Sequence, residues 1–146
     1  NQQIYLNHKA VNEDKEKLSE IKNKVKNFII KQKGIMNVVD LENLNSTTLQ
    51  DYLKSLIENG YNPQRSGDLY FVMNPAWMED FTKGTTHGTS FKYDTHIPLL
   101  WYGWNVKQGK DYSLVSMTDI AATIASLLHI QEPNGCIGKP IIGLMK

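Results

Sequence analysis

The chain has 146 residues, of which 40% are hydrophobic, and its formal net charge is +1. This length suffices for one domain with a buried core, and the balanced charge does not indicate nucleic acid or an anionic membrane as a partner. No apolar run reaches the roughly 18 residues that a membrane-spanning helix needs. We therefore expect a single domain over residues 1–146 with no membrane span.

The first third of the chain predicts two strands with a helix between them. The strands are expected at residues 4–6 and 35–39. Asn12 is the candidate N-cap of the helix, and Gly34 is the candidate stop, because these residue types satisfy helix ends. Apolar residues at steps of three and four give this helix one buried stripe: Leu18, Ile21, Val25, Phe28 and Ile29.

The middle of the chain predicts a second helix and a third strand. Ser46 or Thr47 is the expected cap of the helix, and Gly60 is its expected end. Turn-forming residues at 62–67 precede the strand, which is expected at residues 69–73. The buried stripe of the helix is expected to comprise Leu49, Tyr52, Leu53, Leu56 and Ile57.

The last third begins with a continuous apolar run at residues 97–102, which predicts a buried strand. Ser116 and Asp119 have the spacing of a capping box and predict the start of a final helix. Its buried side chains are expected to be Ile120, Ile124, Leu127 and Leu128. Helices and short strands alternate throughout, so the predicted class is α/β, with a central sheet flanked by helices.

The histidines are the residues most able to carry chemistry. His87 lies in a polar, glycine-bounded loop, the kind of segment on which functional residues gather. His96 follows nine residues later, and Asp80 and Asp94 are the acids that could complete a metal site with them. No H-E-x-x-H spacing or cysteine pair supports such a site. The remaining histidines, His8 and His129, are interpreted as structural or surface residues.

Two of these residues leave alternatives open. Asp94 either forms a local Asx turn or orients a metal-bound imidazole through its second ring nitrogen. His96 is either a metal ligand or a hydrogen-bonded structural histidine ahead of the strand at 97–102. The neighbouring hydroxyls are interpreted as turn formers and not as a nucleophile: Thr85, Thr86, Thr89 and Ser90. The single Cys136 excludes an internal disulfide.

The segment at residues 84–103, GTTHGTSFKYDTHIPLLWYG, resembles a known metal-ligand loop. Thr86-His87-Gly88 and the pattern that follows it, YDTHIPLL, are similar to the C-terminal loop of bacterial alkaline phosphatases with a threonine nucleophile. These enzymes belong to the alkaline phosphatase and nucleotide pyrophosphatase/phosphodiesterase superfamily. Weaker similarities follow the same order at residues 65–68, 115–121 and 138–140.

The resemblance implies that the chain is the C-terminal portion of a two-zinc phosphate monoester hydrolase. In that family, a threonine attacks the phosphate ester, and His87 would ligate the second zinc ion. The nucleophile and the other ligands lie upstream and have no counterpart here, so the isolated chain is expected to be inert and to hold no stoichiometric zinc. The resemblance also implies a periplasmic or secreted parent enzyme.

The sequence leaves two other functions open and also predicts that the isolated chain binds copies of itself. A phosphodiesterase or nucleotide pyrophosphatase of the same superfamily is one alternative, and a non-catalytic α/β binding module is another. Because the strands and apolar stripes are expected to pair with upstream segments, the isolated piece is expected to expose a sheet edge and an apolar patch and to self-associate.

Overall fold

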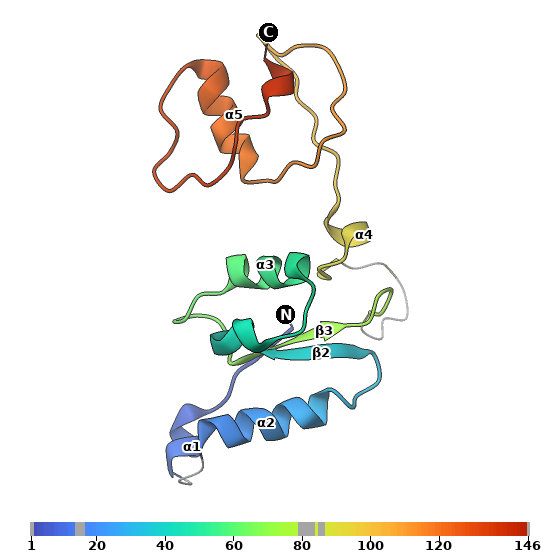
Figure 1. Ribbon diagram of the computed structural model, residues 1–146, viewed down its shortest axis with the longest axis vertical. Helices are drawn as coiled ribbons and strands as arrows, with labels where there is room; N and C mark the ends of the chain where they lie inside the picture. Colours follow the sequence, from blue (N-terminus) through green and yellow to red (C-terminus); the bar gives the residue numbers. More distant parts are fainter. Residues whose placement is uncertain (1, 14–16, 79–83, 85–86, 146) are drawn as a thin grey trace. The chain divides into compact units, whose positions relative to one another are not determined.

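The computed structural model describes residues 2–13, 17–78, 84 and 87–145 (Figure 1). The chain divides into two compact units, Asn1–Ile97 and Pro98–Lys146, and each is described by itself. The expectation of a single domain over 1–146 stays a prediction. Asp80, Thr85 and Thr86, which are close to His87 in the sequence, lie outside the described residues.

The first unit contains a three-stranded antiparallel sheet. Its strands are β1 (Gln3–Ile4), β2 (Ile35–Asp40) and β3 (Leu69–Met73), and their order is β1-β3-β2. The bounds of β3 are those predicted, and β2 runs one residue further than predicted. The first strand is shorter and begins earlier than expected, because only Gln3 and Ile4 pair with β3.

Two helices, α2 (Leu18–Ile29) and α3 (Asp51–Gly60), lie on opposite faces of this sheet (Figure 1). This layering confirms the predicted α/β class with a sheet flanked by helices. Two further elements were not predicted, α1 (His8–Glu13) and the 3₁₀ helix η1 (Leu41–Ser46).

The predicted helix caps are wrong for both main helices. Asn12 lies inside α1, and α2 begins after Lys17 without a side-chain cap. The α3 helix begins after Gln50, also without a side-chain cap, because Ser46 is the last residue of η1. Asp40 caps η1 instead, by accepting a hydrogen bond from the backbone N–H of Glu42 at 3.1 Å.

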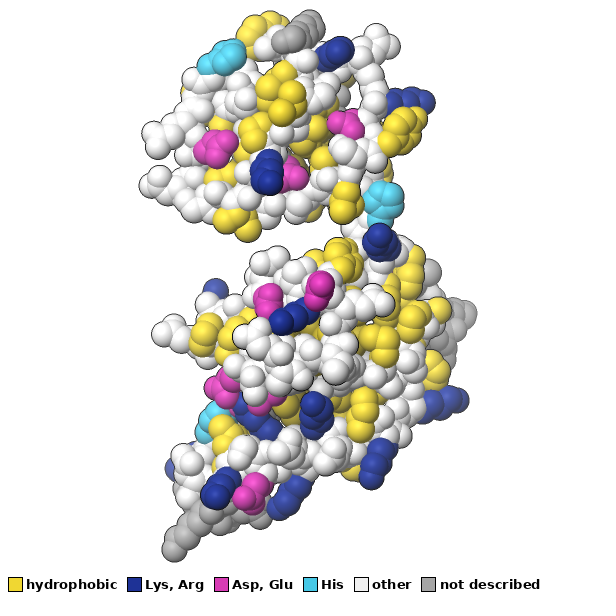
Figure 2. Space-filling model, in the orientation of Figure 1, with side chains coloured by type: hydrophobic (Ala, Val, Ile, Leu, Met, Phe, Trp, Pro, Cys, Tyr) yellow, Lys and Arg dark blue, Asp and Glu magenta, His cyan; other side chains and the backbone are white. Residues whose placement is uncertain are grey.

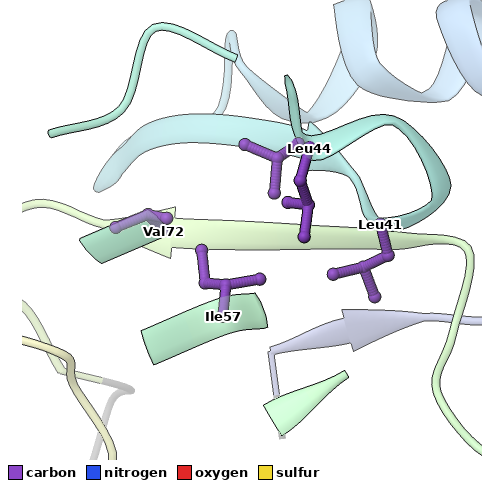
Figure 3. Close-up of a cluster of buried hydrophobic side chains, with 5 residues drawn as sticks. Leu41, Leu44, Ile57 and Val72 are labelled. Atoms are coloured by element: carbon purple, nitrogen blue, oxygen red, sulfur yellow. The ribbon is translucent and has the colours of Figure 1, made fainter. Parts of the chain in front are cut away.

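The hydrophobic core of the first unit lies between the sheet and α3. Its buried side chains come from β2, η1, α3 and β3 (Figure 3): Val39, Leu41, Leu44, Ile57 and Val72. Burial of such branched side chains removes apolar area from water and is the main force that holds the layers together. The prediction that Leu53 and Ile57 are buried is confirmed, whereas Tyr52 is 41% exposed.

The buried line of α2 differs from the predicted stripe at two positions. Phe28 is 65% exposed, and Lys22 is only 5% exposed. Steps of four and three from Leu18 lead to Lys22, then to Val25, so the lysine falls on the line that faces the sheet. Its ammonium group donates to Asp40 at 2.9 Å and to Glu42 at 2.6 Å.

The charge of Lys22 is held in place by these two carboxylates. Burial acts to lower the pKa of Lys22, but the hydrogen bonds and charges of Glu42 and Asp40 outweigh burial and raise it. Lys22 therefore fastens α2 to the end of β2 as a charged group. Sequence periodicity missed this role, because it counts only apolar residues.

The second unit is built around α5 (Asp119–Leu128) and the short 3₁₀ helix η2 (Ile142–Leu144). The capping-box prediction is confirmed in part, since the Ser116 N–H donates to the Asp119 carboxylate at 2.8 Å. The other carboxylate oxygen accepts from the Lys139 N–H at 2.9 Å. Asp119 thereby joins the start of α5 to the C-terminal tail.

The predicted buried face of α5 is wrong, since Ile124 is 43% exposed and Leu128 is 56% exposed. The buried residues of the helix are small: Ala122, Thr123 and Ala125. The reason is that the tail approaches the helix very closely. A β-carbon on Gly138 would collide with the carbonyl of Thr118, and the Thr123 hydroxyl accepts directly from the Ile141 N–H at 3.0 Å.

The predicted strand at residues 97–102 is also wrong. No strand forms there, and the side chains of Leu100 and Tyr102 are 90% and 104% exposed. A strand requires the N–H and C=O groups of a neighbouring strand, and no described residue of the chain supplies them. No described helix has the length and apolar content to cross a membrane.

Large apolar side chains are exposed across the second unit, and Figure 2 shows hydrophobic side chains at the surface. We predict that the isolated chain forms dimers or larger species as its concentration rises, because contact between copies would remove this surface from water. Sedimentation velocity over a wide concentration range measures the association. The exposed set includes Leu100, Tyr102, Trp104, Tyr112, Leu114, Met117, Ile124 and Leu128.

A double variant, Ile124→Lys with Leu128→Lys, is expected to weaken this association. The control is Gln131→Lys with Asn134→Lys, which adds the same charge at exposed polar positions. Sedimentation as a monomer at every concentration would contradict the prediction.

Candidate functional site

His87 lies in the loop that leads to the short helix α4 (Lys92–Thr95). Gly88 follows it directly and has φ +131°, a backbone conformation that other residues rarely adopt. No other part of the described chain comes within 4 Å of the position that a β-carbon of Gly88 would occupy. Backbone conformation, and not crowding, is therefore the reason for a glycine beside this histidine.

One carboxylate organises the loop. Asp94 Oδ1 lies 2.7 Å from Nδ1 of His87. Asp94 Oδ2 accepts three hydrogen bonds, from the Gly88 N–H at 2.9 Å, the Thr89 N–H at 2.6 Å and the Thr89 hydroxyl at 2.9 Å. The Asp94 side chain is 7% exposed, whereas the His87 side chain is 88% exposed. Asp94 thus lies under the loop and supports an imidazole that faces outward.

This arrangement contradicts one of the two interpretations of Asp94, the local Asx turn, while the orientation of a metal-bound imidazole stays a prediction. An Asx turn would have bonded the carboxylate to backbone groups that follow it, whereas its hydrogen bonds run back to residues 87–89. In the neutral tautomer whose proton is on Nδ1, the ring donates to this carboxylate and its lone pair lies on Nε2. That is the tautomer that can present Nε2 to a metal ion.

Three contacts attach the loop and α4 to the rest of the first unit. The Gln2 amide donates to the Gly88 carbonyl at 3.0 Å, and the hydroxyls of Tyr52 and Thr95 lie 3.2 Å apart. The Tyr93 hydroxyl accepts from the Ala76 N–H at 2.9 Å. Residues from the N-terminal segment, α3 and the turn after β3 therefore fix the position of the site.

The other histidines do not join His87. His96 is exposed, and its side chain makes no hydrogen bond to the described residues, so the prediction of a hydrogen-bonded structural histidine is wrong. His8 Nε2 lies 2.7 Å from Oδ1 of the buried Asp68, which also accepts from the Leu6 N–H, and this confirms a structural role. His129 is the C-cap of α5, with φ +53°, which agrees with its interpretation as a structural residue.

The described residues do not form a complete metal site. No group of three or more His, Cys, Asp or Glu side chains that could hold a metal ion occurs among them. A catalytic zinc takes three protein ligands, and His87 fits the chemistry of one of them, since its imidazole is exposed and its Nδ1 is bonded to a carboxylate. Any further ligands would have to come from elsewhere.

The hydrogen bonds to Asp94 determine its charge. Those from Thr89 and His87 lower its pKa well below the ordinary value, the Thr89 N–H having the largest effect, and burial acts in the opposite direction. Because the folded pKa is the lower one, the stabilisation is complete above the ordinary value of about 3.9 and is lost as the pH falls toward the folded pKa.

We therefore predict that the loop stays intact when the pH is lowered through 4 and opens only in stronger acid. The side-chain carboxyl ¹³C shift of Asp94 and the amide shifts of Gly88 and Thr89 measure this in one NMR titration. Titration of the Asp94 carboxyl at or above the ordinary aspartate value would contradict the hydrogen bonding described here.

Comparison with known proteins identifies relatives along the whole chain, although no protein-family model matches it. The chain is 42% identical over its full length to the alkaline phosphatase PhoV of Synechococcus elongatus. It is 37% identical, over 97% of its length, to the alkaline phosphatase PafA of Elizabethkingia meningoseptica. A Myroides odoratus protein named as a calcium-transporting ATPase is 38% identical over 97% of the chain.

The fold agrees with these relatives. The crystal structure of wild-type PafA matches 99% of the chain with a TM-score of 0.94 and 36% identity. The chain spans 26% of PhoV and 26% of the PafA sequence, and 28% of the PafA crystal structure. The chain is therefore a homologue of the C-terminal portion of bacterial alkaline phosphatases, as the resemblance of its sequence indicated.

Proposed function

We propose that the chain is the C-terminal segment of a two-zinc phosphate monoester hydrolase and that His87 supplies one ligand of the second zinc ion. The observation that carries the proposal is the His87–Asp94 pair. An exposed imidazole, bonded through Nδ1 to a carboxylate, lies in the segment whose sequence resembles the metal-ligand loop. Carboxylates and carbonyls commonly orient metal-bound imidazoles in this way.

The chain would position a metal ligand and would not supply the group that attacks the substrate. His87 would hold zinc through Nε2, while Asp94 and the left-handed Gly88 would hold the ring and the loop. When bound, zinc would supply Lewis-acid chemistry to phosphate ester hydrolysis. The nucleophile and the remaining ligands would come from upstream sequence, and the parent enzyme would be periplasmic or secreted.

Two other functions remain to be separated from this one. A phosphodiesterase or nucleotide pyrophosphatase would use the same loop, and a comparison of monoester and diester turnover distinguishes the two. A non-catalytic α/β module would bind a partner through the His87 loop without zinc. Zinc analysis of the full-length protein that contains this chain separates the module from both enzymes.

The central prediction concerns two histidines nine residues apart. In the full-length protein, His87→Ala is expected to reduce zinc occupancy and to lower the hydrolysis of p-nitrophenyl phosphate by orders of magnitude, because a ligand is lost. His96→Ala is the matched control, since its side chain is exposed and unbonded among the described residues, and it is expected to stay within about twofold of wild type. Near-wild-type zinc content and activity in the His87 variant would refute the ligand assignment.

A second prediction concerns the 146 residues alone. One histidine cannot form a zinc site that needs three protein ligands, so the isolated chain is expected to be inactive and to bind no stoichiometric zinc at micromolar metal. Elemental analysis and a phosphatase assay measure both quantities. A chain with Asp94→Ala, purified in parallel, reports contaminating host phosphatase. Turnover that exceeds this background would show that the active site has been placed wrongly.

A further inference from the structure

We propose that Asp94 is a positioning residue that fixes the tautomer of His87, and that aspartate is required there because both of its oxygens must accept hydrogen bonds. The inference rests on the proposed function only where it concerns zinc. The statement about the tautomer concerns residues of this chain alone and can be tested without metal.

The two carboxylate oxygens have separate tasks. Among the described residues, Oδ1 faces only the imidazole Nδ1 of His87, at 2.7 Å. Oδ2 faces two backbone N–H groups and one hydroxyl, those of Gly88 and Thr89. Backbone N–H groups can only donate, so Oδ2 must be an acceptor. The ionised carboxylate satisfies both sides at once.

An asparagine at this position would satisfy only one side. Its amide has one acceptor oxygen, and the donors of Gly88 and Thr89 would draw that oxygen to the place of Oδ2. The NH₂ group would then face Nδ1 of His87 and donate to it. The ring proton would move to Nε2, and Nε2 would lose the lone pair that a metal ion needs.

The substitution Asp94→Asn therefore separates orientation of the ring from support of the loop. A residue that served only to fasten the loop would be replaced well by asparagine, since the bonds to Gly88 and Thr89 survive. A residue that sets the tautomer would not be replaced. Alanine would remove both functions and could not distinguish them.

Two controls match the variant. Asp111→Asn removes the same charge from another hydrogen-bonded turn, in which Asp111 accepts from the N–H of Ser113 at 2.8 Å and from its hydroxyl at 2.6 Å. Neither of these hydrogen bonds involves a histidine. Thr89→Val removes one donor from the loop while the Thr89 N–H still donates to Asp94.

The first measurement uses the 146-residue chain with ¹⁵N-labelled histidine rings, without metal and above the pH at which the ring is protonated. Long-range ¹H–¹⁵N spectra report which ring nitrogen of His87 carries the proton. We expect the Nδ1–H form in the wild type and in both controls, and a change to the Nε2–H form in Asp94→Asn. The amide shifts of Gly88 and Thr89 are expected to stay near their wild-type values.

The second measurement uses the full-length protein after removal of its metal. Zinc affinity is expected to fall by about 10–100-fold in Asp94→Asn, the usual effect of losing a carboxylate that supports a ligand, and to stay unchanged in Asp111→Asn. If Asp94→Asn keeps the Nδ1–H tautomer, the inference is overturned. If the Gly88 and Thr89 amides lose their wild-type shifts while the tautomer stays, Asp94 only fastens the loop, and the inference is overturned as well.

The failure of the proposed function would look different. If the tautomer changes as expected but zinc binds equally well to wild type and to His87→Ala, Asp94 orients His87, and His87 is not a zinc ligand. In that case, the tautomer inference stands and the zinc assignment falls.

Discussion

The bond between Asp94 and His87 determines how the candidate site is arranged. Segment 84–91 is neither strand nor helix where the structure describes it, so it has no backbone ladder to hold it. The carboxylate replaces that ladder with bonds to two successive amides, a hydroxyl and an imidazole. One side chain thus contacts both the backbone of the loop and its histidine, through two different oxygens.

The layered first unit gives this loop a rigid base. Helix α3 packs on the sheet through Ile57 and, through Tyr52, meets Thr95 of α4. Burial of the core therefore positions α4, and α4 carries Asp94. In the second unit, small residues of α5 lie against the tail, while Ile124 and Leu128 remain exposed. The exposed apolar surface of α5 is available for packing against further protein. The chain spans about a quarter of the length of its relatives.

Elements that depend on neighbouring residues in the sequence were predicted correctly. The predictions failed where contacts between distant residues determine the structure. Strand β3 was predicted from its apolar run, and the last residue of α3 was predicted from Gly60. The run at 97–102 was wrongly assigned to a strand, because apolar character does not show whether a pairing partner exists. Lys22 was missed because its two acid partners lie 18 and 20 residues away. His87 was found from its motif, whereas the course of the loop over Asp94 had to come from the structure.

A crystal structure of the full-length protein, with anomalous diffraction recorded at the zinc absorption edge, is the most direct test of His87 as a zinc ligand. We expect an anomalous peak at about 2.0–2.1 Å from Nε2 of His87, with Asp94 still bonded to Nδ1 of the same ring. A zinc ion coordinated without His87, or an imidazole turned so that Nδ1 faces the metal and Asp94 is unbonded, would contradict this expectation.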